Sequence, residues 1–274
     1  MGRPDVIPFP LPETLLADVL DRWALTLDEP ARPGGTSSWV APVHDAAGEA
    51  RFLKLARHHA DAAHEAEGLA MWNGDGTVLL HGHHRADGAY ALLLERCEPG
   101  TELGEVVAEP EQDVVVAGFL RRLWREPEPG QPFRRLTEMC EQWAEEYEEE
   151  PCEDLDPGHE RLGLELYRSL AAPAADDRVL LTDLHAGNIL AAEREPWLVI
   201  DPKPFVGDRT YDVTNHLLNC RDRLFGDPGA LVERMAGLCG VDTERLRLWT
   251  FGRLVVETSW WPELAEVVPR LAPR

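Results

Sequence analysis

The sequence predicts an α+β protein with a small β-rich first part and a larger, mainly helical second part. Up to about residue 97, short runs of apolar residues mark strands, with helix patterns among them. From residue 102 on, apolar residues recur with helical spacing. A Pro-Gly pair at 99–100 breaks the chain between the two regions. We therefore expect an N-lobe of residues 1–97, a C-lobe of residues 98–274, and a cleft between them.

The first part is predicted to hold one sheet. An amphipathic helix is expected over residues 12–26, and a hairpin of strands 39–43 and 51–55 turns at 46–48. A helix over 61–72 and strands over 77–80 and 90–95 complete this part. In the second part, helices are predicted over 111–124, 133–147, 158–170, from 212, and over 242–261. A short β-like insert of 179–181, 189–191 and 197–200 interrupts them.

The net charge of −23 and the pI of about 4.7 favour cationic partners over anionic ones. Such a field repels nucleic acid and anionic membranes and attracts cations, so a cationic small molecule is the expected partner. Plain solubility is the alternative explanation of the charge. The acidic stretch 138–156 has the same two explanations, a solvated helix face or a cation-selecting surface.

No run reaches the roughly 18 apolar residues that a membrane-spanning helix needs. The N-terminus lacks the order of a signal peptide, so a cytoplasmic protein is expected. The five cysteines are odd in number and widely spaced, which argues against a disulfide framework or a zinc site. The aromatic tail with Trp249, Phe251, Trp260 and Trp261 is expected to be mainly helical core.

Three oxygen-bearing side chains form the strongest chemical signal. Asp183 is followed five residues later by Asn188, and Asp201 follows a predicted strand. Phosphoryl transfer needs a carboxylate that orients the acceptor and oxygens that hold Mg²⁺ on the phosphates. Each of these residues alone could merely shape a turn. Together, between apolar strands, they predict a kinase-like site.

Lys54 lies inside an otherwise apolar strand, and a buried ammonium there needs an anion. Glu65 shares one helix face with Leu69 and Trp72, whereas Glu67 points off that face. We expect a Lys54–Glu65 pair that presents the lysine to phosphates; a surface-facing strand lysine is the alternative.

The segment with Gly35, Thr36 and Ser37 could cover phosphates with its N–H groups and hydroxyls, although such clusters are usually loops. Neither a P-loop motif nor a dinucleotide-binding glycine motif is present in the sequence.

The run LTDLHAGNIL at 181–190 resembles the catalytic loop of aminoglycoside phosphotransferases. The run WLVIDPKPFVGD at 197–208, then YDV, is similar to the streptomycin and hydroxyurea phosphotransferase branch, in which Asp-Pro-Lys-Pro replaces the kinase Asp-Phe-Gly. The resemblance extends over about residues 30 to 260. It implies a protein-kinase-like two-lobe fold and an antibiotic-resistance enzyme that uses ATP and Mg²⁺ to phosphorylate a hydroxyl of an antibiotic-like molecule.

The resemblance also implies residue roles. Asp183 would be the catalytic aspartate, Asn188 and Asp201 would bind Mg²⁺, and Lys54, oriented by Glu65, would contact the α- and β-phosphates.

Further roles follow from the same resemblance. The backbone around Glu95 and Cys97 would bind adenine, and Asp212 would brace the catalytic loop, with helix capping as its plainer role. Lys203, in a rigid Pro-Lys-Pro frame, would contact a phosphate or an anionic substrate group, or form a salt bridge with Asp208.

The chain departs from the family pattern at one point. Leu181-Thr182 stands where the family usually has His-Gly. This departure keeps two other functions open, a kinase for a sugar or amino alcohol and a catalytically weakened nucleotide-binding module.

Overall fold

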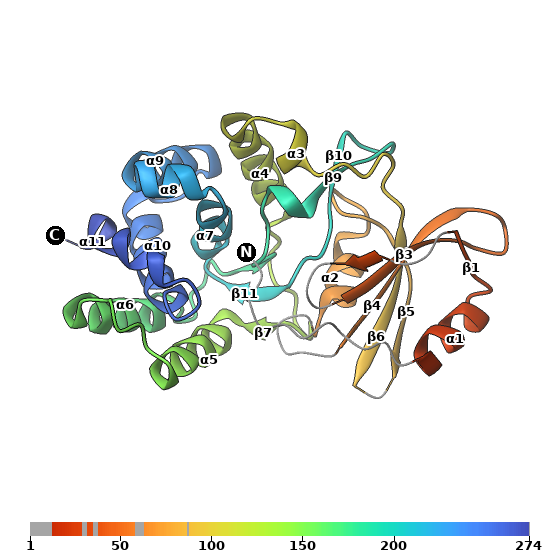
Figure 1. The fold of residues 1–274 in the computed structure, drawn as a ribbon, viewed down its shortest axis with the longest axis horizontal. Helices are drawn as coiled ribbons and strands as arrows, with labels where there is room; N and C mark the ends of the chain where they lie inside the picture. Colours follow the sequence, from red (N-terminus) through yellow and green to blue (C-terminus); the bar gives the residue numbers. More distant parts are fainter. Residues whose placement is uncertain (1–12, 29–31, 35–37, 58–62, 87, 274) are drawn as a thin grey trace. The chain divides into compact units, whose positions relative to one another are not determined.

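The computed structural model describes residues 13–28, 32–34, 38–57, 63–86 and 88–273, and the account below concerns these residues. The chain divides into two compact units (Figure 1). The first unit runs up to Glu102 and also contains Leu190–Ile200; the second consists of Leu103–Ile189 and Asp201–Arg274. The predicted phosphate-covering residues Gly35, Thr36 and Ser37 lie outside the described residues.

A sheet forms the centre of the first unit, with the strand order β1-β3-β4-β6-β5 and β2 paired to β3. Side chains alternate across β4, so Leu53 and Leu55 pack with Leu15 and Val19 of α1, whereas Ala56 faces the core on the side of α2. The elements are α1 (Glu13–Arg22), β1 (Thr26–Leu27), β2 (Arg32–Gly34), β3 (Ser38–His44), β4 (Ala50–Arg57), α2 (Glu65–Trp72), β5 (Leu80–Ala86) and β6 (Ala89–Glu95).

The structure corrects one predicted strand. The apolar run at 77–80 predicts a strand, but β5 begins only at Leu80 and continues through the polar residues to Ala86. Thr77 instead makes an isolated parallel bridge with Val199. The strand β5 lies at the edge of the sheet, where its side chains are largely exposed and can be polar. Its backbone pairing with β6, and not its composition, therefore makes it a strand. Helix α1 also ends at Arg22, earlier than predicted.

A hairpin from the second half of the sequence packs with the first unit. Its strands are β9 (Ile189–Ala191) and β10 (Trp197–Val199). The Val78 N–H donates to the Val199 carbonyl over 3.0 Å, and the Val199 N–H donates to the Gly76 carbonyl over 2.9 Å. Arg194 adds hydrogen bonds to the carbonyls of Gly74 and Thr77. This segment was predicted as an insert within the helical part.

The second unit is mainly helical, with a small sheet in the order β7-β11-β8. Helix α10 is central to it, and its Trp249 packs edge-on against Tyr211 with ring centroids 5.0 Å apart. Trp249 and Phe251 are buried, as predicted, whereas Trp260 and Trp261 are half-buried. The elements are α3 (Leu103–Val106), α4 (Glu109–Leu123), β7 (Arg134–Arg135), α5 (Leu136–Glu149), α6 (Pro157–Leu170), β8 (Arg178–Leu180), η2 (Ala186–Asn188), β11 (Phe205–Gly207), α7 (Arg209–Asn219), α8 (Arg221–Gly226), α9 (Pro228–Cys239), α10 (Thr243–Glu257), η3 (Pro262–Glu266) and α11 (Val268–Leu271).

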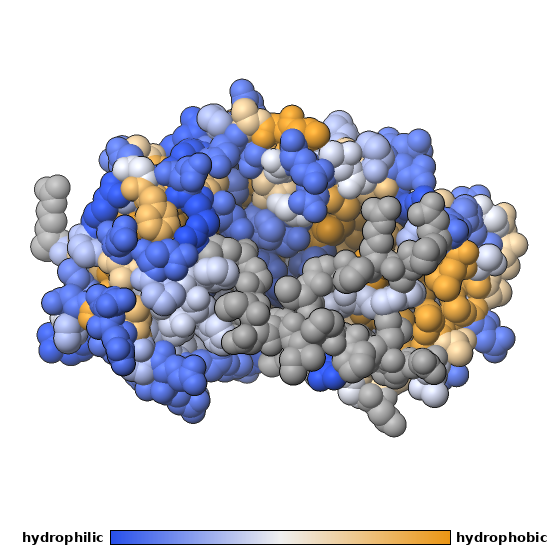
Figure 2. Space-filling model, in the orientation of Figure 1, coloured by the Kyte–Doolittle hydropathy of each residue, from blue (hydrophilic) through white to orange (hydrophobic). Residues whose placement is uncertain are grey.

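The acidic stretch predicted at 138–156 lies mainly on α5. Arg168 of α6 binds Glu141 and Glu148 there, the latter through bonds of 2.7 and 2.9 Å. Figure 2 shows hydrophilic surface over α5 and α6. Part of the acidic stretch is therefore a solvated face whose charge is balanced by a neighbouring helix.

All five cysteines are free thiols, and Cys140, Cys220 and Cys239 are buried. In the part of the chain that the structure describes, no helix is both long and apolar enough to cross a lipid bilayer.

Candidate active site

The first unit holds a buried ion pair. Lys54 on β4 is 7% exposed and Glu65 at the start of α2 is 1% exposed. The Lys54 ammonium donates to both Glu65 carboxylate oxygens over 2.8 Å. The Tyr90 hydroxyl also donates to Glu65, over 3.1 Å. The predicted Lys54–Glu65 pair is therefore confirmed. Glu67 instead binds Arg85, over 2.6 Å.

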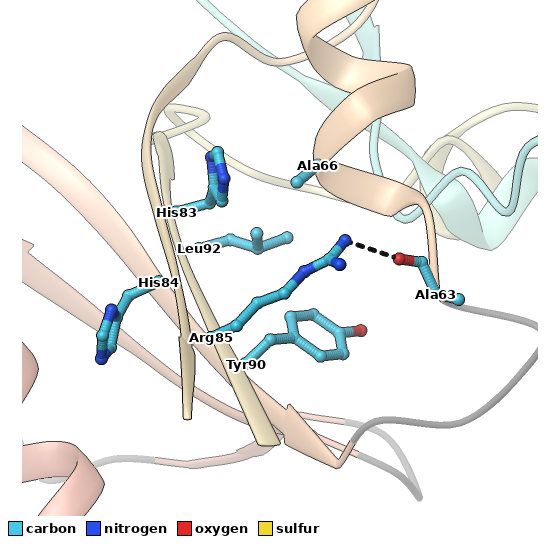
Figure 3. Close-up of a pocket in the computed structure, with 7 residues that line it drawn as sticks. All are labelled: Ala63, Ala66, His83, His84, Arg85, Tyr90 and Leu92. Carbon is cyan, nitrogen blue, oxygen red and sulfur yellow. Dashed lines mark hydrogen bonds between the residues drawn. The ribbon is translucent and has the colours of Figure 1, made fainter. Parts of the chain in front are cut away.

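The sheet face beside α2 carries a small pocket (Figure 3). Its cavity volume of about 10 Å³ holds at most one water molecule. Figure 3 shows Arg85 extending along the pocket toward the Ala63 carbonyl, to which it donates over 3.0 Å. The pocket is lined by Ala63, Ala66, His83, His84, Arg85, Tyr90 and Leu92. Its size excludes a nucleotide, so we assign it only a packing role at the start of α2.

Glu95 is the last residue of β6, and both of its carboxylate oxygens accept hydrogen bonds from other residues of the protein. Its carboxylate accepts from Arg194 over 2.8 Å and from the Leu79 N–H over 2.9 Å. The pKa of Glu95 is lowered: burial opposes the shift, but these bonds outweigh it. Burial raises the pKa of the nearby Cys97 thiol to about 12. The side chain of Glu95 thus holds the β9–β10 hairpin, and only the backbone here remains a candidate for nucleotide binding.

In the second unit, Asp212 supports the loop that follows β8. It is fully buried in the first turn of α7 and accepts from the N–H groups of Leu181 and Thr182 over 3.0 and 2.6 Å. The Trp124 indole donates to the same carboxylate over 2.9 Å. Burial raises the pKa of Asp212 to about 6, and the three donors limit the rise. Asp208, not Asp212, caps α7.

Thr182 has a left-handed backbone, with φ at +49°. A β-branched residue is strained in this region, where glycine is the usual choice. Its N–H bond to Asp212 and its hydroxyl bond to the Lys203 carbonyl, 2.5 Å long, oppose the strain. The loop therefore keeps a glycine-like backbone at the position where the sequence departs from the family pattern.

Asp183 is held at both carboxylate oxygens. Lys203 donates to Oδ2, and the Asn215 side chain donates to Oδ1 over 3.2 Å. Lys203 therefore pairs with Asp183, whereas Asp208, the alternative partner considered for Lys203, accepts from Arg245 and Trp249. The Lys203 ammonium thus lies beside the predicted catalytic aspartate.

The hydrogen bonding of the Asn188 amide nitrogen directs the amide oxygen of this side chain toward a role in cation binding. Its Nδ2 donates to the Asp183 carbonyl over 2.8 Å, which leaves Oδ1 as its possible metal ligand. Asp201 follows β10 and also has a left-handed backbone, with φ at +53°. His185 accepts from the Gly187 N–H, and burial lowers its pKa to about 4, so it is neutral at pH 7. Hard oxygen donors of this kind suit Mg²⁺.

A separate buried cluster joins α4, α7, α8 and α9. Asp113 accepts from His216 over 2.9 Å and from Arg223 and Arg234 over 2.6 to 3.0 Å. Cys220 Sγ lies 3.5 Å from the same nitrogen of His216. Although these three side-chain types can bind metals, the two guanidinium groups already neutralise Asp113. We therefore interpret the cluster as a structural ion network.

Sequence reasoning missed Tyr90, Trp124 and Asn215, which contact the predicted site residues Glu65, Asp212 and Asp183. It also missed Arg253, which contacts Asn215. Asn215 falls within an apolar helix pattern, and a polar residue there is a signal that could have been used. Tyr90 and Trp124 carry no such signal, because aromatic residues are common in any core.

A sheet unit with a buried Lys–Glu pair and a helical unit with an Asp-x₄-Asn loop define a protein-kinase-like fold. An aminoglycoside phosphotransferase, APH(3'')-Id of Streptomyces rimosus, solved with ADP and streptomycin, shares this fold with a TM-score of 0.60 and 20% identity over 93% of this chain and 97% of that chain.

Residues 22–265 match the family described as aminoglycoside/hydroxyurea antibiotic resistance kinase, and the chain belongs to this family. It is 38% identical over 256 residues to the hydroxyurea phosphotransferase of Kitasatospora aureofaciens, covering 92% of this chain and 74% of that protein. It is 35% identical over 254 residues to the streptomycin 6-kinase of Streptomyces glaucescens, covering 90% and 81%. The chain is therefore a phosphotransferase of the antibiotic kinase type.

Proposed function

We propose that this protein uses ATP and Mg²⁺ to phosphorylate a hydroxyl group of a small antibiotic in the chemical range of streptomycin and hydroxyurea. The observation that carries the proposal is the held carboxylate of Asp183, with Lys203 on one oxygen and Asn215 on the other. Family membership supplies the substrate range. Since ATP is a cytosolic substrate, we expect the protein to act in the cytoplasm.

When bound, ATP with its magnesium ion supplies the phosphoryl group to be transferred. Asn188 Oδ1 and the Asp201 carboxylate are the residues that would hold the ion, because both offer hard oxygens. Lys54 would bind phosphate oxygens and Glu65 would hold Lys54 in its extended position. The backbone around Glu95 and Cys97 would bind adenine. We also propose that Gly35, Thr36 and Ser37, which lie outside the described residues, contribute to phosphate binding.

Asp183 would accept a hydrogen bond from the acceptor hydroxyl and take its proton as the hydroxyl oxygen bonds to the γ-phosphorus and the bond between that phosphorus and the departing ADP breaks. Lys203 would stay beside Asp183 and lower the cost of negative charge on the transferred group. Asp212 would keep the loop backbone fixed through Leu181 and Thr182. In this scheme the Asp183 carboxylate accepts the proton, the Asp201 carboxylate holds the ion, and the Asp212 carboxylate fixes the loop backbone.

The test is to follow ADP release by the purified protein with ATP, Mg²⁺ and either streptomycin or hydroxyurea, and to identify the phosphorylated product by mass spectrometry. Asp183→Ala is expected to abolish transfer while leaving nucleotide binding intact. Asp176→Ala, at an exposed site of the same unit outside the acidic stretch, is the matched control and should behave as wild type. A panel of sugars and amino alcohols tests the alternative acceptors. Transfer that survives Asp183→Ala would refute the assignment.

A further inference from the structure

A buried arginine is linked to Asp183 through a single side chain. Arg253 of α10 is 4% exposed and Asn215 of α7 is 5% exposed. Arg253 Nη2 donates to Asn215 Oδ1 over 2.9 Å, and Asn215 Nδ2 donates to Asp183 Oδ1 over 3.2 Å. The guanidinium and the carboxylate of the active site are thus the two ends of one polar chain.

The chemistry of its two neighbours determines the orientation of the Asn215 amide. A guanidinium only donates hydrogen bonds, and an ionised carboxylate only accepts them. The amide oxygen must therefore face Arg253 and the amide nitrogen must face Asp183. A flipped amide would oppose donor to donor at one end and acceptor to acceptor at the other.

Arg253 is itself held by several partners. Its Nη1 donates to Thr214 Oγ1 over 2.9 Å, and its Nε and Nη2 lie 3.3 Å from Glu257 Oε1. The guanidinium also lies over the rings of Tyr211 and Trp143, 5.2 and 5.7 Å from their centroids. Burying a guanidinium costs several kcal/mol unless its partners are well placed. These partners hold the Arg253 guanidinium in one position, so it supports the Asn215 side chain rigidly.

We propose that Asn215 and Arg253 are positioning residues for phosphoryl transfer, which fix Asp183 Oδ1 so that Oδ2, beside Lys203, faces the acceptor hydroxyl. This inference rests on the proposed function. The last torsion of an aspartate is broad, so a carboxylate held at one oxygen only can rotate. Misplacement of a reacting group by about 1 Å costs on the order of 100-fold in rate.

Asn215→Asp separates positioning from a purely structural role. The new carboxylate still accepts from Arg253, but it loses the donor to Asp183 and places a like charge beside it. We expect kcat to fall about 100-fold, with the KM values for ATP and acceptor within about threefold of wild type. Affinity for ADP, measured by tryptophan fluorescence, should be unchanged. An unchanged kcat in the folded variant would overturn the inference, as would a change confined to KM.

Asn73→Asp is the charge control, because it makes the same substitution at an exposed residue of the first unit, and its kcat should stay near that of wild type. Equal losses in the two variants would show a general charge effect and overturn the inference.

A second pair of variants tests Arg253, at the other end of the hydrogen-bonded series that leads to Asp183. Arg253→Lys keeps a buried cation and should retain more of kcat than Arg253→Met, at equal nucleotide affinity. Equal kcat in these two would refute a positioning role even if Asn215→Asp failed to fold. Wild-type protein that transfers no phosphate would refute the proposed function instead, so the two failures are distinguishable.

Discussion

The buried carboxylate of Asp212 makes a measurable prediction about stability and pH. Its pKa is about 6 in the folded protein against 3.8 when unperturbed. The folded state therefore binds this proton more tightly than the unfolded state does. As pH rises from about 4 to about 6, the unfolded chain has lost the proton while the folded chain still holds it, so Asp212 makes the protein progressively less stable.

The size of the effect follows from the difference of about two pKa units. At 1.36 kcal/mol per unit, Asp212 lowers the free energy of unfolding by about 3 kcal/mol in all, and by about 2 kcal/mol between pH 4 and pH 7, because at pH 4 the unfolded carboxyl is already partly ionised. Asp212→Asn removes the titration and leaves a side chain of the same shape. The expected result is that wild type loses about 2 kcal/mol relative to this variant over that range.

The assay is urea unfolding of both proteins at several pH values, followed by tryptophan fluorescence. Asp154→Asn, at an exposed position, is the control and should show a constant difference from wild type. A constant difference for Asp212→Asn, or a wild type that gains stability relative to this variant as pH rises, would refute the reasoning. It would mean that the three N–H donors outweigh the cost of burial.

Three further predictions concern other charged groups. Lys54→Met should lower kcat/KM for ATP at least about tenfold while leaving Mg²⁺ dependence intact, as steady-state kinetics would show; an unchanged value would remove Lys54 from the nucleotide site. Asp201→Ala should reduce kcat at least about 100-fold at any Mg²⁺ concentration, because several kcal/mol of charge stabilisation depend on the ion. A variant as active as wild type would contradict the metal assignment. Asp113→Ala should destabilise the protein by about 2–3 kcal/mol in urea unfolding, since Arg223 and Arg234 lose their charged hydrogen-bond partner. A loss below about 1 kcal/mol would contradict a structural ion network.

Local patterns predicted most of the helices and the buried pair of the first unit. The spacing of Glu65, Leu69 and Trp72 places them on one helix face, and an ammonium in an apolar strand needs a carboxylate, so the Lys54–Glu65 pair was predictable. The polar edge strand β5 was not, because its pairing depends on the neighbour β6 and not on its own composition.

The partners of the active-site loop were harder to predict. Asp183 and Lys203 are 20 residues apart and Asp183 and Asn215 are 32 apart, so nothing in their local spacing indicates contact. Of the two partners considered for Lys203, Asp208 instead caps α7 and accepts from Arg245 and Trp249. Competing partners from other helices decide such contacts.

By itself the sequence determined the α+β class and the order of most elements, and it predicted side chains of the types that phosphoryl transfer needs, because backbone periodicity and residue chemistry are local properties. The tertiary structure alone decided which charges meet: Lys203 with Asp183, Asn215 with Arg253, and Asp212 with the loop backbone. The physical reason is that a buried charge takes whichever partner the packing brings within hydrogen-bond distance.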